Sequence, residues 1–378
     1  MNRVKTTLKI LTAAFSSLAA GSVMAAWETN LPQGVTEISR EVYDMHMWVM
    51  GICAVIGVVV FGAMTISIIK HRKSKGVTPA TFHENILAEV IWTIIPFAIL
   101  IAMAIPAAKA LIKMEDTSNA DLTVKITGYQ WKWEYEYLDQ GVRFFSNLAE
   151  ESRAAAGLDS GVDVTKVENY LLDVDNPLVL PVGKKIRFLL TANDVIHAWW
   201  IPDFAIKKDA IPGFINQMWT NIDEPGTYRG QCAELCGKDH GYMPIVVEAV
   251  SEEEFDAWVV AQNEAAAAEA NSADREWTME ELMERGEATY QTACAACHQP
   301  DGTGIAGAFP ALAGNADMLA DVAGHIDVIL NGVSGTAMQA FGGQLSDVDI
   351  AAVVTYERNA WGNNAGDLVQ PSQVKAAR

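Results

Sequence analysis

The amino-acid sequence predicts a multi-domain membrane protein with a two-helix transmembrane hairpin, an all-β domain and a small all-α domain, in that order. Two long apolar runs lie in the first third of the 378 residues. Short alternating runs separated by Gly and Pro follow as far as residue 250, and helical patterns with capping residues return after residue 275. A chain of this length exceeds one compact unit and accommodates two small domains beside membrane segments.

The charge balance restricts the class of partner. The chain carries 27 Lys and Arg against 47 Asp and Glu, a formal net charge of −20. An acidic chain repels the phosphate backbone, so no nucleic acid is expected as a partner. The charge fits a solvated surface and gives only weak support for docking a basic protein.

Residues 1–25 have the layout of a secretory signal peptide. Three basic residues precede an apolar core from 10 to 20, and small residues end at Ala25, after which we expect cleavage. A retained anchor fits less well, because this core is too short to span a bilayer.

The transmembrane hairpin is expected within 26–113. Its apolar runs, 45–69 and 88–111, each provide the about 20 residues that a membrane helix needs. The outer flanks are acidic, whereas the loop between the runs carries four basic residues: Lys70, Arg72, Lys73 and Lys75. The positive-inside rule therefore places this loop in the cytoplasm and everything after about residue 113 in the periplasm or an equivalent space.

Glu89 lies at the start of the second apolar run. A carboxylate at this depth costs about 1–3 kcal/mol, so it is expected to face protein or water. A charge that simply extends to the membrane interface fits the position equally well.

The β domain is expected over 114–250. Apolar residues alternate from Leu122, and four aromatic residues continue on odd positions from Trp131. The change of phase at Gly128 predicts a β-bulge there. Further strands are expected near 170–180, 186–191, 197–201, 218–222 and 244–250, with 139–167 as an inserted excursion. Many short strands with Pro and Gly turns are typical of an antiparallel barrel or sandwich.

The stretch C-A-E-L-C-G-K-D-H-G-Y-M contributes Cys232, Cys236, His240 and Met243. Thiolate, imidazole and thioether ligands suit copper, and two cysteines at this spacing can bridge two copper ions, which favours fast electron transfer. His197, at an expected strand end, gains weight because two coppers need a second imidazole. The alternative is a disulfide between the two cysteines in an oxidising compartment, with the histidine and methionine as surface and core residues.

An acidic, Ala-rich linker, partly helical, is expected at 251–274. In the following domain, 275–365, Cys294-Ala-Ala-Cys297-His298 is the attachment signature of a c-type haem. The two thiols form thioethers to the porphyrin, and His298 becomes the proximal iron ligand.

Two capping boxes bracket this signature, Thr278 with Glu281 and Ser346 with Asp349. They predict helices on both sides of it, which favours a small all-α cytochrome over an isolated redox or zinc pair. Residues 366–378 are expected to form a C-terminal tail.

The sixth iron ligand is expected to be a methionine in a loop before the last helix. Met338 fits this description best. Met318 and His325 are the alternatives, but each lies in a stretch that is expected to be helical, which favours packing.

The two-span hairpin, the C-x-E-x-C-x-x-x-H-x-x-M motif and the trailing haem domain together resemble subunit II of a haem-copper cytochrome c oxidase with a fused cytochrome c. The resemblance implies a cupredoxin fold for the β domain, a class I cytochrome c fold for the helical domain and a binuclear copper centre, CuA. The implied CuA ligands are His197, Cys232, the backbone carbonyl of Glu234, Cys236, His240 and Met243. The Glu234 carboxylate would also bind a magnesium ion (Mg) shared with subunit I.

Three further positions follow from the resemblance. Trp131, in G-Y-Q-W-K-W-E-Y, matches the point at which electrons enter, whereas Trp133 is expected to pack in the core. Glu89, in E-V-I-W-T-I-I-P, matches a glutamate at the mouth of a proton channel into subunit I. The sequence departs from the family at Phe214, where an arginine often follows Pro-Gly, and this puts a contact near the subunit interface in doubt.

The function implied is that of the electron-input subunit of a proton-pumping cytochrome c oxidase. Electrons would pass from haem c to CuA and on to haem in subunit I, where dioxygen is reduced to water. The implied partners are subunits I and III, membrane lipid, and cytochrome c or a quinol-cytochrome c reductase as donor. The implied location is the bacterial inner membrane, crossed more than once, with both redox domains in the periplasm.

Three rival functions fit less well. A membrane-anchored copper chaperone would account for neither Met243, nor the second span, nor the haem domain. A quinol oxidase subunit would lack the copper ligands, and a nitrous oxide reductase would need a large histidine-rich domain.

Overall fold

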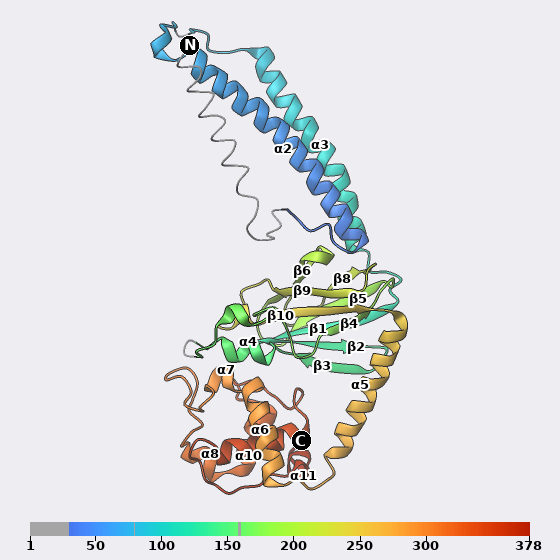
Figure 1. Ribbon diagram of the computed structural model, residues 1–378, viewed down its shortest axis with the longest axis vertical. Helices are drawn as coiled ribbons and strands as arrows, with labels where there is room; N and C mark the ends of the chain where they lie inside the picture. Colours follow the sequence, from blue (N-terminus) through green and yellow to red (C-terminus); the bar gives the residue numbers. More distant parts are fainter. Residues whose placement is uncertain (1–29, 79, 158–159) are drawn as a thin grey trace.

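The computed structural model describes residues 30–78, 80–157 and 160–378, so the expected signal peptide lies outside the described residues. A helical hairpin, a β-sandwich and a helical domain follow one another, with the hairpin and the helical domain at opposite ends of the sandwich (Figure 1). One long helix, α5, runs down the side of the sandwich to the helical domain. The predicted fold class is confirmed in all three parts.

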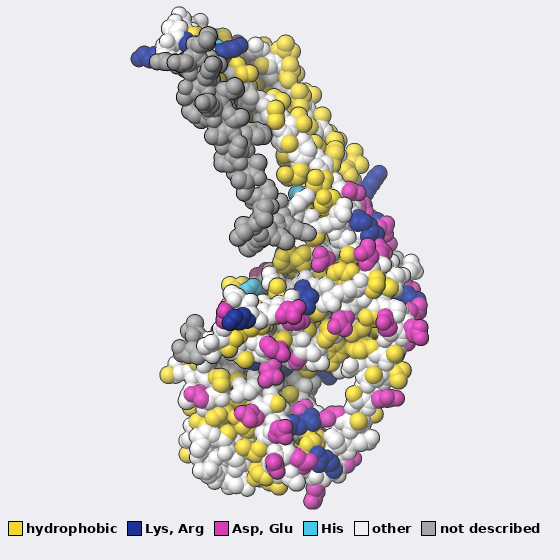
Figure 2. Space-filling view, in the orientation of Figure 1, with side chains coloured by type: hydrophobic (Ala, Val, Ile, Leu, Met, Phe, Trp, Pro, Cys, Tyr) yellow, Lys and Arg dark blue, Asp and Glu magenta, His cyan; other side chains and the backbone are white. Residues whose placement is uncertain are grey.

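The hairpin consists of α2 (Glu37–Lys70) and α3 (Ile86–Glu115), both long and apolar enough to cross a membrane. A capping box of Thr36 with Ser39 begins α2, and the side chain of Asn85 caps α3. Hydrophobic side chains cover the hairpin, and basic residues gather at the end that carries its loop (Figure 2). This charge distribution agrees with the orientation predicted from the sequence.

The other end of the hairpin is attached to the sandwich. Lys113 joins the two helices, because its Nζ lies 2.7 Å from Glu37 and 2.8 Å from Glu41. Its backbone carbonyl accepts a hydrogen bond from Trp219 Nε1 at 3.0 Å, and the buried Thr36 hydroxyl donates to Phe204 O at 3.3 Å. Both helices therefore begin or end on the β domain.

The sandwich consists of two five-stranded sheets, with the orders β3-β2-β1-β5-β8 and β4-β10-β9-β6-β7. The strands are β1 (Leu122–Tyr129), β2 (Lys132–Tyr137), β3 (Val142–Ser146), β4 (Leu178–Pro181), β5 (Ile186–Ala192), β6 (His197–Ile201), β7 (Ile206–Ala210), β8 (Asn216–Thr220), β9 (Gly226–Cys232) and β10 (Pro244–Val250). The expectation of a purely antiparallel arrangement is wrong, because β1 pairs with β5, and β4 with β10, in parallel. Neither pair is joined by a hairpin, so nothing in the connections forces the strands to be antiparallel.

Aromatic side chains of β2 fill the space between the sheets. Trp133, Tyr135 and Tyr137 are fully buried. The Tyr137 hydroxyl donates to Val179 O at 2.7 Å, and Trp199 Nε1 donates to the Tyr135 hydroxyl at 3.2 Å. The large rings thus supply apolar area while these polar atoms keep hydrogen-bond partners.

The β-bulge expected at Gly128 is wrong. Strand β1 continues through Gly128 to Tyr129 in regular register with β2, and the chain reverses at 130–131. The aromatic residues change phase because a two-residue turn separates two strands. Glycine is needed at this position for another reason, since a Cβ on Gly128 would lie 2.8 Å from the ring of His197.

The expected excursion at 139–167 is only partly irregular. It contains β3, which extends the first sheet, and the short helix α4 (Glu150–Ala155). Strands β7 and β9 lie outside every expected strand, and of 170–180 only the last residues enter β4. The strands expected at 197–201 and 244–250 are confirmed as β6 and β10.

The helical domain contains α6 (Met279–Ala293), α7 (Ala295–His298), α8 (Ala316–Ala320), α9 (Val322–Asn331), α10 (Asp347–Asn359) and α11 (Pro371–Ala377). Both predicted capping boxes are confirmed at the starts of α6 and α10. Tyr290, Tyr356 and Trp361 pack ring against ring in its core. The last residues, expected as a tail, form α11 and bury Val374 completely.

The two soluble domains are connected by α5 (Glu252–Ser272), a continuous helix where the sequence predicted a partly helical linker. At its start, Phe255 is buried in the core of the sandwich. Near its end, Glu269 accepts a hydrogen bond from Arg285 of the helical domain at 2.6 Å. The helix is therefore held at both ends.

Candidate metal centre and haem cavity

The residues of the copper motif lie at the end of strand β9 and in the loop that connects it to β10 in the second sheet. Cys232 ends β9, Cys236 lies in the loop that follows, and His240 begins the short 3₁₀ helix that precedes Met243 and β10. His197 begins β6, which pairs with β9. The pairing of β6, β9 and β10 therefore brings the distant histidine to the motif.

The donor atoms of this cluster already lie close together. The sulfurs of Cys232 and Cys236, both free and buried, are 3.8 Å apart. His197 Nδ1 lies 4.0 Å from Cys232 Sγ, and His240 Nδ1 lies 3.4 Å from Cys236 Sγ. The backbone carbonyl of Glu234 lies 3.4 Å from Cys232 Sγ. A compact set of thiols and imidazoles suits copper.

Met243 is 1% exposed and belongs to the same buried core as both cysteines. Its backbone carbonyl accepts from the Cys232 N–H at 3.0 Å, which fixes it beside them. Among the described residues, the metal-binding group whose donor atoms all lie within 4.8 Å of one another consists of His197, Cys232 and Cys236. His240 stands slightly outside that group, on the Cys236 side.

Neighbouring groups set the protonation of the cluster. Asp194 Oδ1 lies 2.9 Å from His197 Nε2, which leaves Nδ1 directed at Cys232. Burial opposes a charge on His197, but the hydrogen bonds and charges of Asp194 and Cys232 together outweigh burial and raise the pKa of His197. The contact between the two sulfurs lowers the pKa of Cys232 and raises the pKa of Cys236. The pair therefore retains one proton, which a metal would displace.

Trp131 lies directly beside this cluster. Its indole Nε1 donates to the backbone carbonyl of Cys236 at 3.1 Å, and Gln130 Nε2 donates to the same carbonyl at 2.9 Å. A Cβ on Gly237 would lie 2.8 Å from Gln130 Nε2, so only glycine allows this approach. The 130–131 turn and the copper loop thus form one packed unit.

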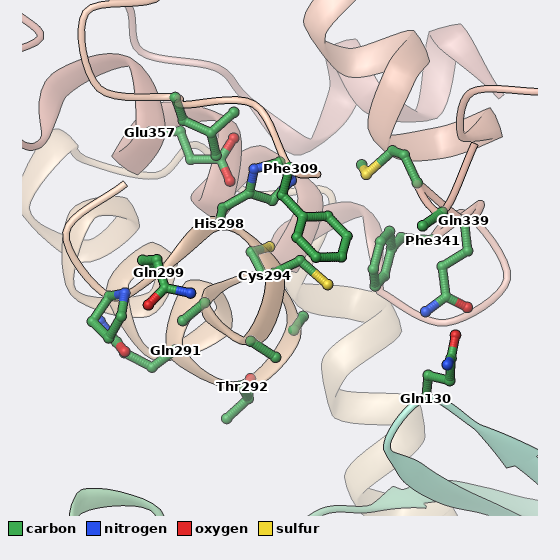
Figure 3. Close-up of a pocket in the computed structure, with 18 of the residues that line it drawn as sticks. Gln130, Gln291, Thr292, Cys294, His298, Gln299, Phe309, Gln339, Phe341 and Glu357 are labelled. Atoms are coloured by element: carbon green, nitrogen blue, oxygen red, sulfur yellow. The ribbon is translucent and has the colours of Figure 1, made fainter. Parts of the chain in front are cut away.

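A cavity of about 1460 Å³ lies between the sandwich and the helical domain. Cys294, Cys297 and His298 line it from the helical side, and Trp131 lines it from the sandwich. Figure 3 shows Cys294 and His298 beside Phe309 and Phe341, with Gln130 approaching from the sandwich on the side of Gln339. The haem-attachment motif therefore faces the copper domain across one shared space.

His298 has the orientation that an iron ligand needs. Its Nδ1 lies 2.9 Å from the backbone carbonyl of Pro310, so Nε2 remains free for a metal. Burial raises the pKa of Cys294, which is consistent with a side chain enclosed by the cavity wall. The cavity, the two thiols and the oriented imidazole together fit a covalently bound haem.

All three candidates for the sixth ligand line the cavity. Met338 lies in the loop between α9 and α10, whereas Met318 lies in α8 and His325 in α9. His325 Nε2 is engaged by Glu357 at 2.7 Å in a nearly fully buried pair. Because Met338 combines a loop position with access to the cavity, it remains the predicted axial ligand.

Other predicted residues lie elsewhere. Glu89 is in the first turn of α3, at the loop end of the hairpin, and accepts from the Asn85 N–H at 3.3 Å. That end of the hairpin lies away from the β-sandwich (Figure 1). Phe214 lies between β7 and β8 and is 57% exposed, as is its neighbour Ile215.

Sequence reasoning missed several residues that orient the ligands. Asp194 was detectable, because it precedes His197 by three residues and second ligand shells are commonly carboxylates. Pro310, Glu357 and Lys132 had no local signal, since each acts on residues that only the tertiary fold brings near.

The chain matches three family models: cytochrome c oxidase subunit II, transmembrane domain, over 24–110; cytochrome c oxidase subunit II, periplasmic domain, over 122–250; and cytochrome c oxidase, cbb3-type, subunit III, over 281–356. The third match covers the domain with the haem-attachment motif. These matches follow the same order as the hairpin, the sandwich and the helical domain.

Relatives agree with the family models. A probable cytochrome c oxidase subunit 2 of Rickettsia bellii is 39% identical over 258 residues, which cover 68% of this chain and 93% of the relative. Cytochrome c oxidase subunit 2 of Cereibacter sphaeroides is 34% identical, with 61% of this chain and 79% of the relative covered. The crystal structure of the periplasmic domain of subunit II of cytochrome oxidase of Bradyrhizobium japonicum is 41% identical, covers 39% of this chain and 98% of its own, and has a TM-score of 0.35.

The subunit II models account for the hairpin and the copper-binding sandwich, and this family implies CuA copper. The cytochrome model accounts for the helical domain and implies haem c. The chain belongs to the cytochrome c oxidase subunit II family and carries a cytochrome c-type domain at its C-terminal end.

Proposed function

We propose that this chain receives electrons at its haem c, passes them to the binuclear CuA centre and delivers them to a haem in subunit I, where dioxygen is reduced to water and protons are pumped. The observation that carries the proposal is the position of Trp131. Its side chain lines the cavity of the haem-attachment motif and donates to the carbonyl of the copper ligand Cys236. One indole therefore touches both sites.

The sandwich residues hold the copper pair in this proposal. Cys232 and Cys236 would hold the two ions through their thiolates, His197 and His240 through their imidazoles, Met243 through its thioether and Glu234 through its backbone carbonyl. The distances of 3.4 to 4.0 Å from the sulfurs to the imidazoles support this arrangement. When bound, haem and copper each supply a one-electron couple, so one iron is oxidised as one copper pair is reduced and no bond forms or breaks.

The helical domain holds the haem through four side chains. Cys294 and Cys297 form the thioethers, and His298, oriented by the Pro310 carbonyl, ligates the iron. Met338, which lines the same cavity, would supply a thioether as the second axial ligand. Phe309 and Phe341 contribute aromatic rings to the lining of the cavity (Figure 3).

The remaining roles depend on the partner subunits. Glu89 would admit protons from the cytoplasmic side into subunit I, and Glu89→Ala should then slow oxygen reduction while CuA is still reduced normally. The Glu234 carboxylate would bind Mg shared with subunit I, and a manganese signal that Glu234→Ala removes would support it. Subunits I and III, with cytochrome c or a quinol-cytochrome c reductase as donor, complete the proposed assembly in a bacterial inner membrane.

The test of the electron route is Trp131→Ala in the purified oxidase complex. We expect the haem to be reduced normally but its electron to reach CuA much more slowly, because the packed contact between the two sites is lost. Flash-induced absorption changes of haem and copper measure this step. Trp258→Phe is the matched control, since Trp258 packs on Tyr137 away from the copper loop. A wild-type transfer rate in Trp131→Ala, with both centres present by their spectra, would refute the route.

A further inference from the structure

Basic side chains of the sandwich form hydrogen bonds to the helical domain. Three basic side chains each donate to a backbone carbonyl: Arg143 to Gly343 at 3.0 Å, Arg153 to Gln291 at 3.3 Å and Lys238 to Ala296 at 2.9 Å. Within the described residues, none of the three pairs with a carboxylate of the helical domain. That domain is acidic, with 13 Asp and Glu against five Lys and Arg over 275–378.

A fourth cation, Lys132 of β2, is buried in the same contact and is 8% exposed. Its Nζ lies 4.3 Å from the ring centroid of Phe145 in the sandwich and 5.7 Å from that of Phe341 in the helical domain. It lines the cavity together with Trp131 and Cys294. In the described part of the chain, Lys132 forms no ion pair.

A buried ammonium group that forms no ion pair interacts strongly with any charge placed beside it, because the protein interior screens charges weakly. Burial lowers the pKa of Lys132 to about 8, and the carboxylates of Glu134 and Asp175 oppose this shift from a distance. Lys132 therefore stays mostly protonated at pH 7. The two aromatic faces stabilise the cation only partly. Because Lys132 and Cys294 line the same cavity, the charge of Lys132 would act on the haem that Cys294 would hold.

We propose that Lys132 is a positioning residue that makes docking of the helical domain on the sandwich depend on the oxidation state of the haem. Lys132 favours the docked position when the haem carries one positive charge less, which is its reduced state. Oxidation restores that charge beside the buried ammonium and weakens docking. The helical domain therefore lies over Trp131 while it has an electron to deliver. This inference rests on the proposed route from haem to copper.

Docking and reduction are linked in both directions. If reduction strengthens docking by a given factor, docking must raise the ratio of reduced to oxidised haem by the same factor. Couplings between two protein sites commonly amount to roughly 5–150-fold, and for one buried charge at the haem edge we expect about tenfold. Removing the charge should therefore change both docking and the haem potential.

The test compares the wild-type oxidase complex with Lys132→Met, Lys132→Arg and Lys125→Met. Methionine keeps the length of the side chain without its charge, and arginine keeps the charge. Lys125, on the neighbouring strand β1, is the matched control, because it is partly exposed and pairs with Glu136 at 3.1 Å. Amide hydrogen exchange of segments 130–132 and 339–343, in oxidised and in reduced complex, reports docking. A spectroscopic redox titration reports the haem potential.

In the wild type we expect these segments to exchange about tenfold more slowly in the reduced than in the oxidised complex. Lys132→Met should lose most of this difference and lower the haem potential, whereas Lys132→Arg and Lys125→Met should keep both. The inference is overturned if wild-type exchange is independent of oxidation state. It is also overturned if Lys132→Met keeps the wild-type difference or potential, or if Lys132→Arg behaves like Lys132→Met.

Failure of this inference is distinguishable from failure of the proposed function. If the wild-type haem does not reduce CuA in flash experiments, the route itself is wrong. If transfer occurs but the exchange results are negative, only the role of Lys132 is wrong.

Discussion

The copper cluster and the haem cavity hold their groups in opposite ways. At the copper cluster neighbouring donor atoms already lie 3.4 to 4.0 Å apart, on two paired strands of one domain and the loop that follows them. At the haem cavity the proposed ligands come from α7 and from the loop before α10. The cavity between them has a volume of about 1460 Å³. The sandwich builds its site from its own core, whereas the core of the helical domain is completed by the group that it binds.

This difference follows from domain size and fold. The sandwich places Trp133, Tyr135 and Trp199 between two full sheets, so its core closes without copper. The helical domain is smaller, and a cavity lies beside its haem-attachment motif, so the side chains that line it lack packing partners until a group fills it. The two sites should therefore respond differently to loss of their cofactors.

The largest effect is expected when the haem cannot be attached. In the double variant Cys294→Ala, Cys297→Ala the helical domain should lose cooperative folding, because the cavity beside its haem-attachment motif stays unfilled, while the sandwich stays folded and binds copper. Limited proteolysis measures the first outcome and the copper spectrum measures the second. Cys53→Ser, in α2, is the control for cysteine loss. If the helical domain resists protease without haem, it folds without its bound group, and the proposed difference between the two domains is wrong.

A smaller effect is expected from the sixth ligand. Met338→Ala should leave the haem attached through its thioethers but lower its reduction potential, because a thioether ligand favours reduced iron. Redox titration of the full chain measures this shift. Met318→Ala is the matched control, since Met318 lines the same cavity from α8. An unchanged potential in Met338→Ala, with a shift in Met318→Ala, would reassign the ligand.

The sequence alone predicts residues that belong to short motifs, but not residues whose role depends on tertiary contacts. The copper motif and the haem-attachment motif are local spacings, so Cys232, Cys236, Cys294 and His298 could be selected without a fold. The interpretation of Gly128 was wrong because its glycine is required by the ring of His197, which local alternation cannot show.

Lys132 illustrates the part that no sequence pattern contains. Its position in a strand predicts an ordinary half-exposed lysine, and its burial depends on how the helical domain docks. Its contact with Phe341 joins two domains that are separated by a long helix. The way two domains dock depends on the shape and charge of their whole surfaces. Residues at the contact between them therefore cannot be predicted from a local sequence pattern.

The smallest effect is expected at Asp194, whose replacement should change the copper site and leave the haem site unchanged. Asp194 accepts from the Gln130 N–H at 2.7 Å and holds His197 Nε2 at 2.9 Å, so it fixes the imidazole that faces Cys232. Asp194→Asn keeps the shape but removes the charge, and loss of a carboxylate that holds a ligating histidine typically weakens metal binding about 10–100-fold.

Competition with a copper chelator should show this weakening in Asp194→Asn, while the haem potential stays at its wild-type value. Asp163→Asn, in an exposed turn, should change neither quantity. A copper affinity that does not change would mean that strand pairing alone orients His197. A simultaneous shift of the haem potential would mean instead that the 130–131 turn transmits changes from the copper loop to the cavity, and the two sites would then have to be treated as one.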